Sequence, residues 1–320
     1  MIDAHVHYLR REWVEALWTP ELRRSSSLWP KLGLRLPQLT DAAQVLATLD
    51  ARGIERAVIF PELSVAPGPQ TPGGLPAALA ITRSMNDMTA AMEKRYPNRF
   101  CGLAIVNPLG NADDLAELRR AVVGLGLHGV AVGASYRGMT IDAHQAHPFL
   151  ASVEALDVPL VIHPTVGGPG QTQRDLSLDL LQGVPMDLTQ VAIRLIVSGR
   201  LTEFPRLRVV LPHLGGGLLA LLGWLDAMAE ELRPRPAVRA RRFWVDTATA
   251  SPAALAGAIT AFGADHVMLG TDWPLSSPAP SGEPQSDPVA MLDTLSLTPE
   301  ERAAVLGQAA QQLFGAGDER

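Results

Sequence analysis

Short runs of apolar residues alternate with longer amphipathic segments along most of this chain. The apolar runs are continuous, which is typical of parallel strands whose two faces are both covered. We expect eight strands, over residues 1–7, 54–60, 100–106, 128–133, 158–163, 208–213, 242–246 and 266–272. Segments with a helical spacing of apolar residues separate them. We expect these helices over residues 40–52, 76–95, 111–124, 146–156, 185–200, 217–232, 252–262, 286–295 and 298–313.

The regular alternation of strand and helix predicts an α/β fold. Eight strand–helix units in 320 residues favour a (β/α)8 TIM barrel. An open, doubly wound sheet is the alternative, but no Gly-x-Gly-x-x-Gly sequence follows the first strand. No linker or break in composition divides the chain, so we expect a single domain over residues 1–320. Prolines and tryptophans interrupt residues 8–39, which predicts an irregular insertion after strand 1.

Composition narrows the classes of function. Hydrophobic residues make up 47% of the chain and charged residues 19%, which indicates a sizeable core and argues against disorder. The net charge of −6 argues against nucleic acid as a partner, because phosphate binding needs a basic face. No apolar run reaches the roughly 18 residues of a membrane span, and the N-terminus lacks the pattern of a signal peptide. We therefore expect a cytoplasmic protein that binds neither nucleic acid nor membrane.

The first strand ends in two histidines, His5 and His7, that point to the same side. Side chains alternate along a strand, so residues two apart share a face, and Asp3 lies on that face too. Two imidazoles at this spacing can reach one metal ion. The pair alone is a weak signal, because one histidine could be hydrogen-bonded and the other exposed. Since Cys101 is the only cysteine, any metal here would be bound by histidine and carboxylate.

Three further strands end on residues that bind metals or move protons. They are His163 after the fifth strand, His213 after the sixth and Asp272 after the eighth. Taken singly, each has a structural explanation, such as an aspartate in an Asx turn. The carboxyl ends of the strands in a βα barrel meet at one mouth, however, so these residues should converge. Several imidazoles with one carboxylate favour Zn²⁺ as the ion, with Mn²⁺, Fe²⁺ or Co²⁺ as alternatives.

These motifs, in this order, resemble those of the amidohydrolase superfamily, in the branch typified by aminocarboxymuconate-semialdehyde decarboxylase. The similarity covers nearly the whole chain. It rests on Asp3-Ala4-His5-Val6-His7, Val161-Ile162-His163-Pro164, Gly183-Val184-Pro185-Met186-Asp187, Leu195-Ile196-Val197-Ser198-Gly199, Phe204-Pro205, His213-Leu214-Gly215-Gly216-Gly217, Gly270-Thr271-Asp272-Trp273-Pro274 and Leu313-Phe314-Gly315. The resemblance implies a TIM barrel, one divalent metal ion, a small-molecule substrate and a homodimer.

The resemblance also implies roles for individual residues. His213 would be the catalytic histidine that handles a proton, with Asp272 assisting between metal and substrate. Asp3 would orient a ligand imidazole from behind. The metal ligands would be His5, His7, His163 and Asp272.

The chain departs from this branch at positions that bind substrate. Benzoate-type decarboxylases of the branch carry Glu-x-His where this chain has His5-Val6-His7. Val45 stands near the position of the arginine that holds the substrate carboxylate in the muconate-semialdehyde enzyme. The candidates to replace that arginine are Arg137, Arg174 and, across a dimer interface, Arg233. Arg137 and Arg174 also fit solvated loop residues.

Four other histidines do not end strands, and we expect them to be structural or exposed: His128, His144, His147 and His266. Two reactions are compatible with the predicted metal site. The leading hypothesis is a metal-dependent, non-oxidative decarboxylation of a small unsaturated or aromatic carboxylic acid. The alternative is hydrolysis of a lactone or amide by metal-activated water, which the retained His-x-His pair favours. A non-catalytic metal-binding module would lack a ligand, and none is missing.

Overall fold

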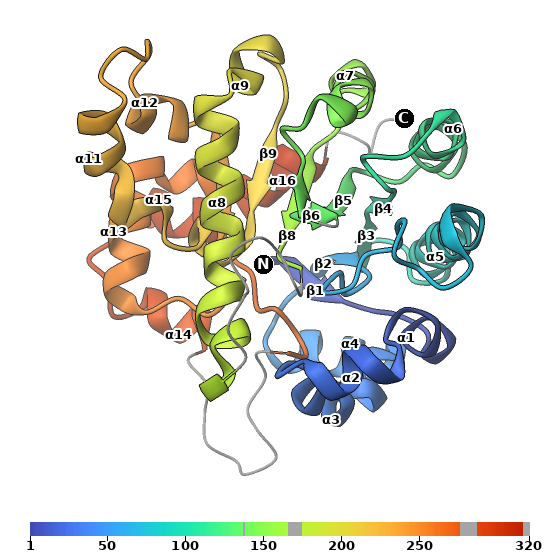
Figure 1. Ribbon diagram of the computed structural model, residues 1–320. Helices are drawn as coiled ribbons and strands as arrows, with labels where there is room; N and C mark the ends of the chain where they lie inside the picture. Colours follow the sequence, from blue (N-terminus) through green and yellow to red (C-terminus); the bar gives the residue numbers. More distant parts are fainter. Residues whose placement is uncertain (137, 166–174, 276–286, 316–320) are drawn as a thin grey trace.

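The computed structural model describes residues 1–136, 138–165, 175–275 and 287–315 and has the predicted (β/α)8 barrel (Figure 1). Its parallel strands are β1 (Ile2–His7), β2 (Arg56–Phe60), β3 (Phe100–Gly102), β4 (Ala104–Ile105), β5 (Val130–Gly133), β8 (Leu160–His163), β9 (Val209–Leu211), β10 (Phe243–Asp246) and β11 (Val267–Met268). Hydrogen bonds order them β1-β2-β3 and β4-β5-β8-β9-β10-β11, and only one residue separates β3 from β4. Backbone bonds from Ala4 to Leu269 (2.7 Å) and from His7 to Trp273 (2.9 Å) close the barrel between β11 and β1.

Helices surround the strands, with α5 and α6 on one side and α11 to α13 on the other (Figure 1). A small antiparallel hairpin of β6 (Ser135–Tyr136) and β7 (Met139–Thr140) follows β5. The α-helices are α1 (Arg11–Leu17), α2 (Pro20–Ser25), α3 (Trp29–Leu39), α4 (Ala42–Ala51), α5 (Gly74–Arg95), α6 (Ala112–Arg119), α7 (His147–Leu156), α8 (Val184–Val197), α9 (Arg200–Glu203), α10 (Pro212–Gly215), α11 (Leu218–Met228), α12 (Pro236–Ala240), α13 (Pro252–Phe262), α14 (Pro288–Leu292), α15 (Pro299–Ala303) and α16 (Ala309–Phe314). Shorter 3₁₀ or π segments are η1 (Arg120–Gly124), η2 (His144–Ala146), η3 (Asp175–Ser177), η4 (Asp179–Gly183), η5 (Ala264–His266) and η6 (Ala304–Gln308).

Strand alternation explains which polar side chains face the inside of the barrel. In β8, Leu160 and Ile162 pack in the core between strands and helices, whereas Val161 packs in a second core cluster that includes the barrel interior. His163 follows with the same parity as Val161, so it points inward at the end of the strand. The same alternation in β10 leaves Asp246 facing inward. The alternation of side chains along the strands thus places His163 and Asp246 inside the barrel at its carboxyl end.

The insertion after strand 1 is helical, which corrects the prediction of an irregular segment. Residues 11–39 form α1, α2 and α3. Pro20 and Pro30 occupy the first turns of α2 and α3, where a missing N–H costs nothing. Trp13 and Trp18 are each only 3% exposed and anchor the helices to the core around β1 and β2. Prolines that read as loop signals in the sequence therefore mark helix starts.

The last barrel strand is shorter than expected, because β11 covers only Val267–Met268 and residues 269–272 are not in a regular strand. Residues 175–177 and 179–183 form the short helical segments η3 and η4. The continuous helix Asp179–Val197 has 19 residues and a mean hydropathy of 1.3, enough for a membrane span by length and composition alone. Core helices pass the same test, and the second half of this one packs in the core between strands and helices.

Candidate metal centre and active site

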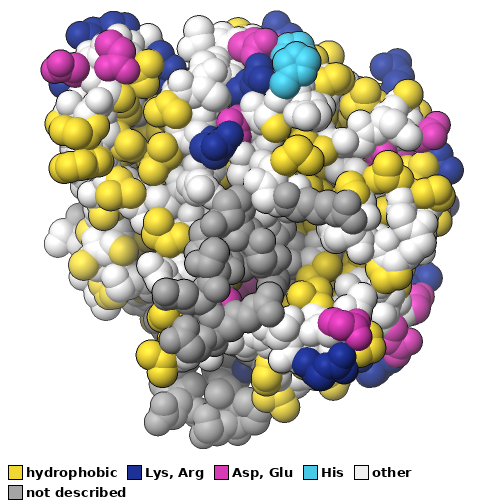
Figure 2. All heavy atoms as spheres, in the orientation of Figure 1, with side chains coloured by type: hydrophobic (Ala, Val, Ile, Leu, Met, Phe, Trp, Pro, Cys, Tyr) yellow, Lys and Arg dark blue, Asp and Glu magenta, His cyan; other side chains and the backbone are white. Residues whose placement is uncertain are grey.

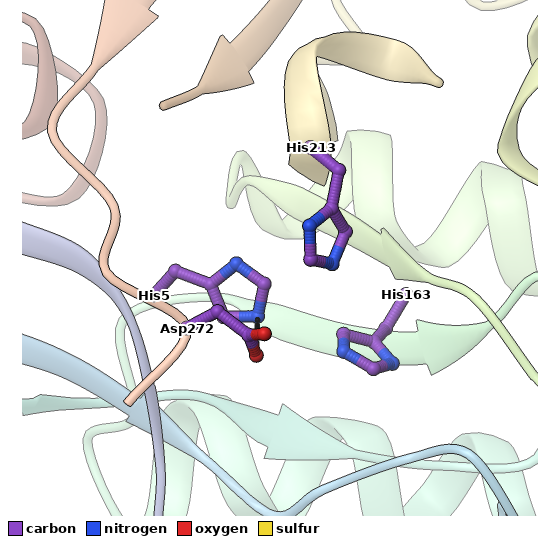
Figure 3. A group of neighbouring side chains, drawn as sticks. All are labelled: His5, His163, His213 and Asp272. Carbon is purple, nitrogen blue, oxygen red and sulfur yellow. Dashed lines mark ion pairs between the residues drawn. The ribbon is translucent and has the colours of Figure 1, made fainter. Parts of the chain in front are cut away.

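The polar residues predicted at the strand ends converge at the carboxyl mouth of the barrel. His5 comes from β1, His163 from the end of β8, His213 from α10 after β9, and Asp272 from the segment after β11. Figure 3 shows these side chains pointing toward one another. Each offers one donor atom, and the four atoms all lie within 4.8 Å of one another. The structure thus brings together residues that are up to 267 positions apart (272 − 5).

His7 joins the same cluster. Its Nε2 lies 3.1 Å from Nε2 of His5 and 3.2 Å from Oδ1 of Asp272. Nε2 of His5 lies 3.5 Å from the same Asp272 oxygen. Ligands about 2.1 Å from one tetrahedral ion are roughly 3.4 Å apart, so the three separations fit donors to a common ion.

The Nδ1 atoms of these histidines are all held by acceptors. Nδ1 of His5 donates to Oδ2 of Asp246 (2.9 Å), Nδ1 of His7 faces the carbonyl of Phe60 (3.4 Å), and Nδ1 of His163 donates to the carbonyl of Pro164 (2.9 Å). Nδ1 of each ring thus faces an acceptor and Nε2 faces the cluster, which is the arrangement in which Nε2 can bind a metal ion. Second partners that fix the tautomer in this way are usual for histidines that bind metals.

Several unprotonated donors facing one point need a cation between them. Nε2 of His163 is buried and has no hydrogen-bond partner among the described residues. An unsatisfied buried polar atom costs about 1–3 kcal/mol, and a bound ion would remove that cost. Three imidazole nitrogens and a carboxylate form a donor set for a divalent transition metal. The residues of this cluster therefore fit one divalent metal ion.

The charges around the cluster favour a positive charge at its centre. Burial lowers the pKa of His5, but Asp246, Asp272 and Asp3 raise it to about 9 overall. Burial raises the pKa of Asp272, but its bond with His7 and the charge of His5 hold that pKa well below its usual range. The negative charges that stabilise a proton on His5 would also stabilise a divalent cation at the centre of the cluster.

His213 has a different environment from the other histidines. Burial lowers its pKa, so its imidazole is neutral near pH 7. Its Nδ1 lies 3.1 Å from Oγ1 of Thr249, and that hydroxyl lies 2.7 Å from the carbonyl of Ala248. The carbonyl can only accept, so the single hydroxyl proton goes to Ala248 and Thr249 accepts from Nδ1 of His213. The free lone pair of His213 is therefore on Nε2.

Asp246 supports two histidines at once. Its Oδ2 accepts from the ring of His5, while its Oδ1 accepts from the backbone N–H of His213 (2.9 Å) and of Ala248 (3.1 Å). His213 needs this support, because its backbone is left-handed (φ 53°). Asp3, which we expected to orient an imidazole, instead accepts from the backbone of His5 (3.0 Å) and from Thr271. Asp3 ties β1 to the segment after β11, and Asp246 orients the ring.

The roles expected of the three substrate arginines stay predictions. Arg137 and Arg174 lie outside those residues. Arg233 is exposed between α11 and α12, where its guanidinium contacts the carbonyls of Glu230 and Leu232.

The remaining histidines make structural contacts away from the cluster or lie exposed, as expected. His128 bonds Glu93 (2.5 Å) and His147 bonds Glu203 (2.8 Å). His266 stacks on Trp244, and His144 is exposed beside His147.

Two residues near the cluster escaped the sequence analysis. Glu62 is buried directly after β2, near His7, and accepts from the N–H (2.7 Å) and the hydroxyl of Ser64. Burial raises the pKa of Glu62. Thr249 follows β10 by three residues. Both residues lie beyond the carboxyl end of a strand, and that position is the sequence feature that could have identified them.

A cavity of about 850 Å³ opens over the cluster. His163, His213 and Asp272 line its floor, together with Ser64 and Thr249. The rest of the described lining is almost entirely aliphatic. A concave apolar pocket with a few polar groups at its base is typical of a small-molecule site.

A parallel βα barrel with a buried cluster of histidines and aspartate at its carboxyl mouth defines a metal-dependent barrel enzyme. The family model described as amidohydrolase matches residues 2–316, and the chain belongs to this amidohydrolase family. The membership confirms the resemblance found in the sequence.

Several relatives and solved structures that the chain matches are decarboxylases. It is 31% identical to gamma-resorcylate decarboxylase of Rhizobium radiobacter over 78% of this chain and 81% of that one. It is 27% identical to 2-amino-3-carboxymuconate-6-semialdehyde decarboxylase of Dictyostelium discoideum over 62% of this chain and 57% of that one. The structure of 5-carboxyvanillate decarboxylase from Sphingomonas paucimobilis superposes with a TM-score of 0.85 at 25% identity, and the match covers 98% of both chains.

Proposed function

We propose that the protein is a metal-dependent decarboxylase that releases CO₂ from a hydroxylated aromatic carboxylic acid. The observation that carries the proposal is the position of His213, whose Nε2 lone pair is free beside the ligand cluster at the floor of an apolar cavity. Relatives that act on gamma-resorcylate and on 6-methylsalicylic acid support an aromatic substrate.

The residues divide the chemistry between binding and proton transfer. His5, His7, His163 and Asp272 would hold a metal ion, and its positive charge would attract the substrate carboxylate. Neutral His213 accepts a proton from a substrate hydroxyl at Nε2 and returns one to the ring carbon that bears the carboxylate. A C–H bond forms there as the bond to the carboxyl carbon breaks, and CO₂ leaves. Thr249 and Asp246 keep His213 in its tautomer and position throughout.

The test separates decarboxylation from the hydrolysis considered above. Purified protein would be assayed with hydroxybenzoic acids for CO₂ release, and with lactones and amides for acid release. We expect CO₂ and the corresponding phenol from at least one hydroxybenzoic acid. Acid release from a lactone without CO₂ from any acid would contradict the proposal and favour the hydrolase.

Zinc is the metal we propose for this site, because three imidazoles and one carboxylate match its preferred ligands. Manganese is the alternative, and it is the metal bound in 5-carboxyvanillate decarboxylase from Novosphingobium aromaticivorans. Elemental analysis of protein purified without added metal distinguishes them. We expect about one zinc per chain, and stoichiometric manganese instead would contradict zinc.

A homodimer is the assembly we propose, formed through α11 and the adjoining α12. Trp224 and Met228 on α11 are 64% and 60% exposed, and Val238 on α12 is 55% exposed. Figure 2 shows hydrophobic side chains gathered over this part of the surface. An exposed patch of this kind is typical of an interface between copies. Sedimentation should give a dimer for the wild type and for Leu34→Asp on exposed α3, and a monomer for Trp224→Asp.

A further inference from the structure

The outer wall of the cavity is built from the first turns of three successive barrel helices. These are α8, α11 and α13, which follow β8, β9 and β10 around the barrel. Together with η4 they contribute aliphatic side chains, which are Leu181, Val184, Leu219, Ala220, Ala253 and Ala254. The wall extends outward from the floor formed by His163, His213 and Asp272.

The three hydroxyl groups of the described wall all take part in hydrogen bonds within the protein. The hydroxyl of Ser64 bonds Glu62, and that of Thr249 is shared between Ala248 and His213. Ser251 accepts the N–H of Ala254 as the cap of α13. Asp272 is the one charged residue of the described lining, and it belongs to the metal site. A ligand beyond the floor therefore meets aliphatic surface.

The volume of the cavity and the exposure of its lining also favour an apolar ligand. The cavity volume of about 850 Å³ lies near the upper end of the range for small-molecule pockets. It can therefore hold a ligand much larger than a single ring. Leu181 at its edge is 69% exposed. This side chain extends the apolar surface of the cavity toward solvent.

We infer that the substrate is a hydroxylated aromatic acid that carries an extended apolar substituent, such as an alkyl chain, bound between α8, α11 and α13. The inference rests on the proposed decarboxylase function for the position of the acid group at the floor. The carboxylate and hydroxyl lie at the metal site, and the substituent on the far side of the ring lies along Ala253, Ala254, Leu219 and Leu181. Selectivity for the substituent then comes from apolar burial along the described wall.

The experiment uses 4-alkyl-2-hydroxybenzoic acids with alkyl chains of increasing length, together with the 3-alkylphenols that they would yield. Each buried methylene should improve kcat/KM for the acids, and lower Kd for the phenols, about three- to fourfold until the wall is covered. Calorimetric binding of the phenols requires no turnover. It therefore tests the apolar site even where no CO₂ is released.

Two variants on the same helix make the binding test specific. Ala253→Asp places a charge on the cavity wall, and an acidic residue in a first helical turn does not disturb folding. Ala256→Asp places it on an exposed residue of α13 that does not line the cavity. We expect Ala253→Asp to abolish the dependence of Kd on chain length and Ala256→Asp to keep it.

The outcomes separate this inference from the proposed function. CO₂ release with no effect of chain length would overturn the inference and leave the decarboxylase standing. Length-dependent binding of the phenols without CO₂ from any acid would support the apolar site and overturn the decarboxylase. Length dependence that persists in Ala253→Asp would also overturn the inference, because binding would then lie elsewhere.

Discussion

Thr249 accepts a hydrogen bond from Nδ1 of His213 while its own backbone adopts a left-handed conformation, with φ of 57°. A β-branched residue rarely adopts this conformation, and the cost is of order 1–3 kcal/mol. Such strain persists where the surrounding structure enforces it, which is common at functional sites. Here the strained backbone places the hydroxyl where it fixes the tautomer of His213.

Thr249→Val should therefore lower kcat by roughly 10- to 100-fold, the effect expected when an outer partner of a functional histidine is lost. The valine leaves Nδ1 of His213 without an acceptor, so the ring can turn or change tautomer. Thr249→Ser retains the hydroxyl and should keep most of the activity. Steady-state kinetics and metal content would be measured for both variants. Equal losses in the Val and Ser variants would show that the effect does not depend on the hydroxyl group.

His213→Ala should keep the metal and lose activity by roughly 10²- to 10⁴-fold, the range for a missing general acid–base group. The four proposed ligands remain in place, so elemental analysis should still give about one metal per chain. His144→Ala, on an exposed histidine, serves as the control and should behave like the wild type. Loss of metal from His213→Ala would instead make His213 a ligand.

Asp272→Asn should lose the metal and with it the stabilisation that the metal gives. An ion that binds only the folded state raises the free energy of unfolding by mass action. A chelator should therefore lower the Tm of the wild type and leave that of Asp272→Asn unchanged. Asp265→Asn, on an exposed aspartate, should respond to the chelator like the wild type. A chelator-sensitive Tm in Asp272→Asn would show that the carboxylate is dispensable for binding.

Because of Asp187, the free energy of unfolding should decrease as the pH is raised from about 4 to about 6. Burial raises the pKa of this carboxyl from 3.8 to about 6, although Oδ2 accepts from the N–H and hydroxyl of Thr165. Its Oδ1 is buried without a hydrogen-bond partner among the described residues. The folded state thus binds the proton more tightly than the unfolded state. The resulting destabilisation is absent below the unfolded pKa, grows as pH rises, and is complete above the folded pKa.

Asp187→Asn removes this ionisation. At pH 7 the variant should be more stable than the wild type by at most about 3 kcal/mol, and the difference should shrink toward zero at pH 4. Urea unfolding at the two pH values measures it, and the shared metal site cancels in the comparison. A variant that is less stable at pH 7 than at pH 4, relative to the wild type, would show that the folded protein favours the charged carboxylate.

The site was predictable where it depended on strand ends. His5, His7, His163 and Asp272 could be placed together because alternation is local and all parallel strands of a barrel end at one mouth. The helices of residues 11–39 were missed because a proline has the same appearance in a loop and in a first helical turn. Glu62 and Thr249 were missed because a single polar residue after a strand is more often a turn residue than part of a site.

The sequence by itself determined the barrel, the convergence of the metal ligands and the family, since these follow from periodicity and from motifs along the chain. Only the tertiary structure decided which nitrogen of each histidine faces the centre. For His5 and His213 that choice depends on acceptors far away in sequence, which are Asp246, 241 residues from His5, and Thr249, 36 residues from His213. It also decided the aliphatic wall, because α8, α11 and α13 meet there only once the barrel has closed. Hydrogen-bond partners and cavities arise from contacts between segments that are distant in sequence, so no local sequence pattern predicts them.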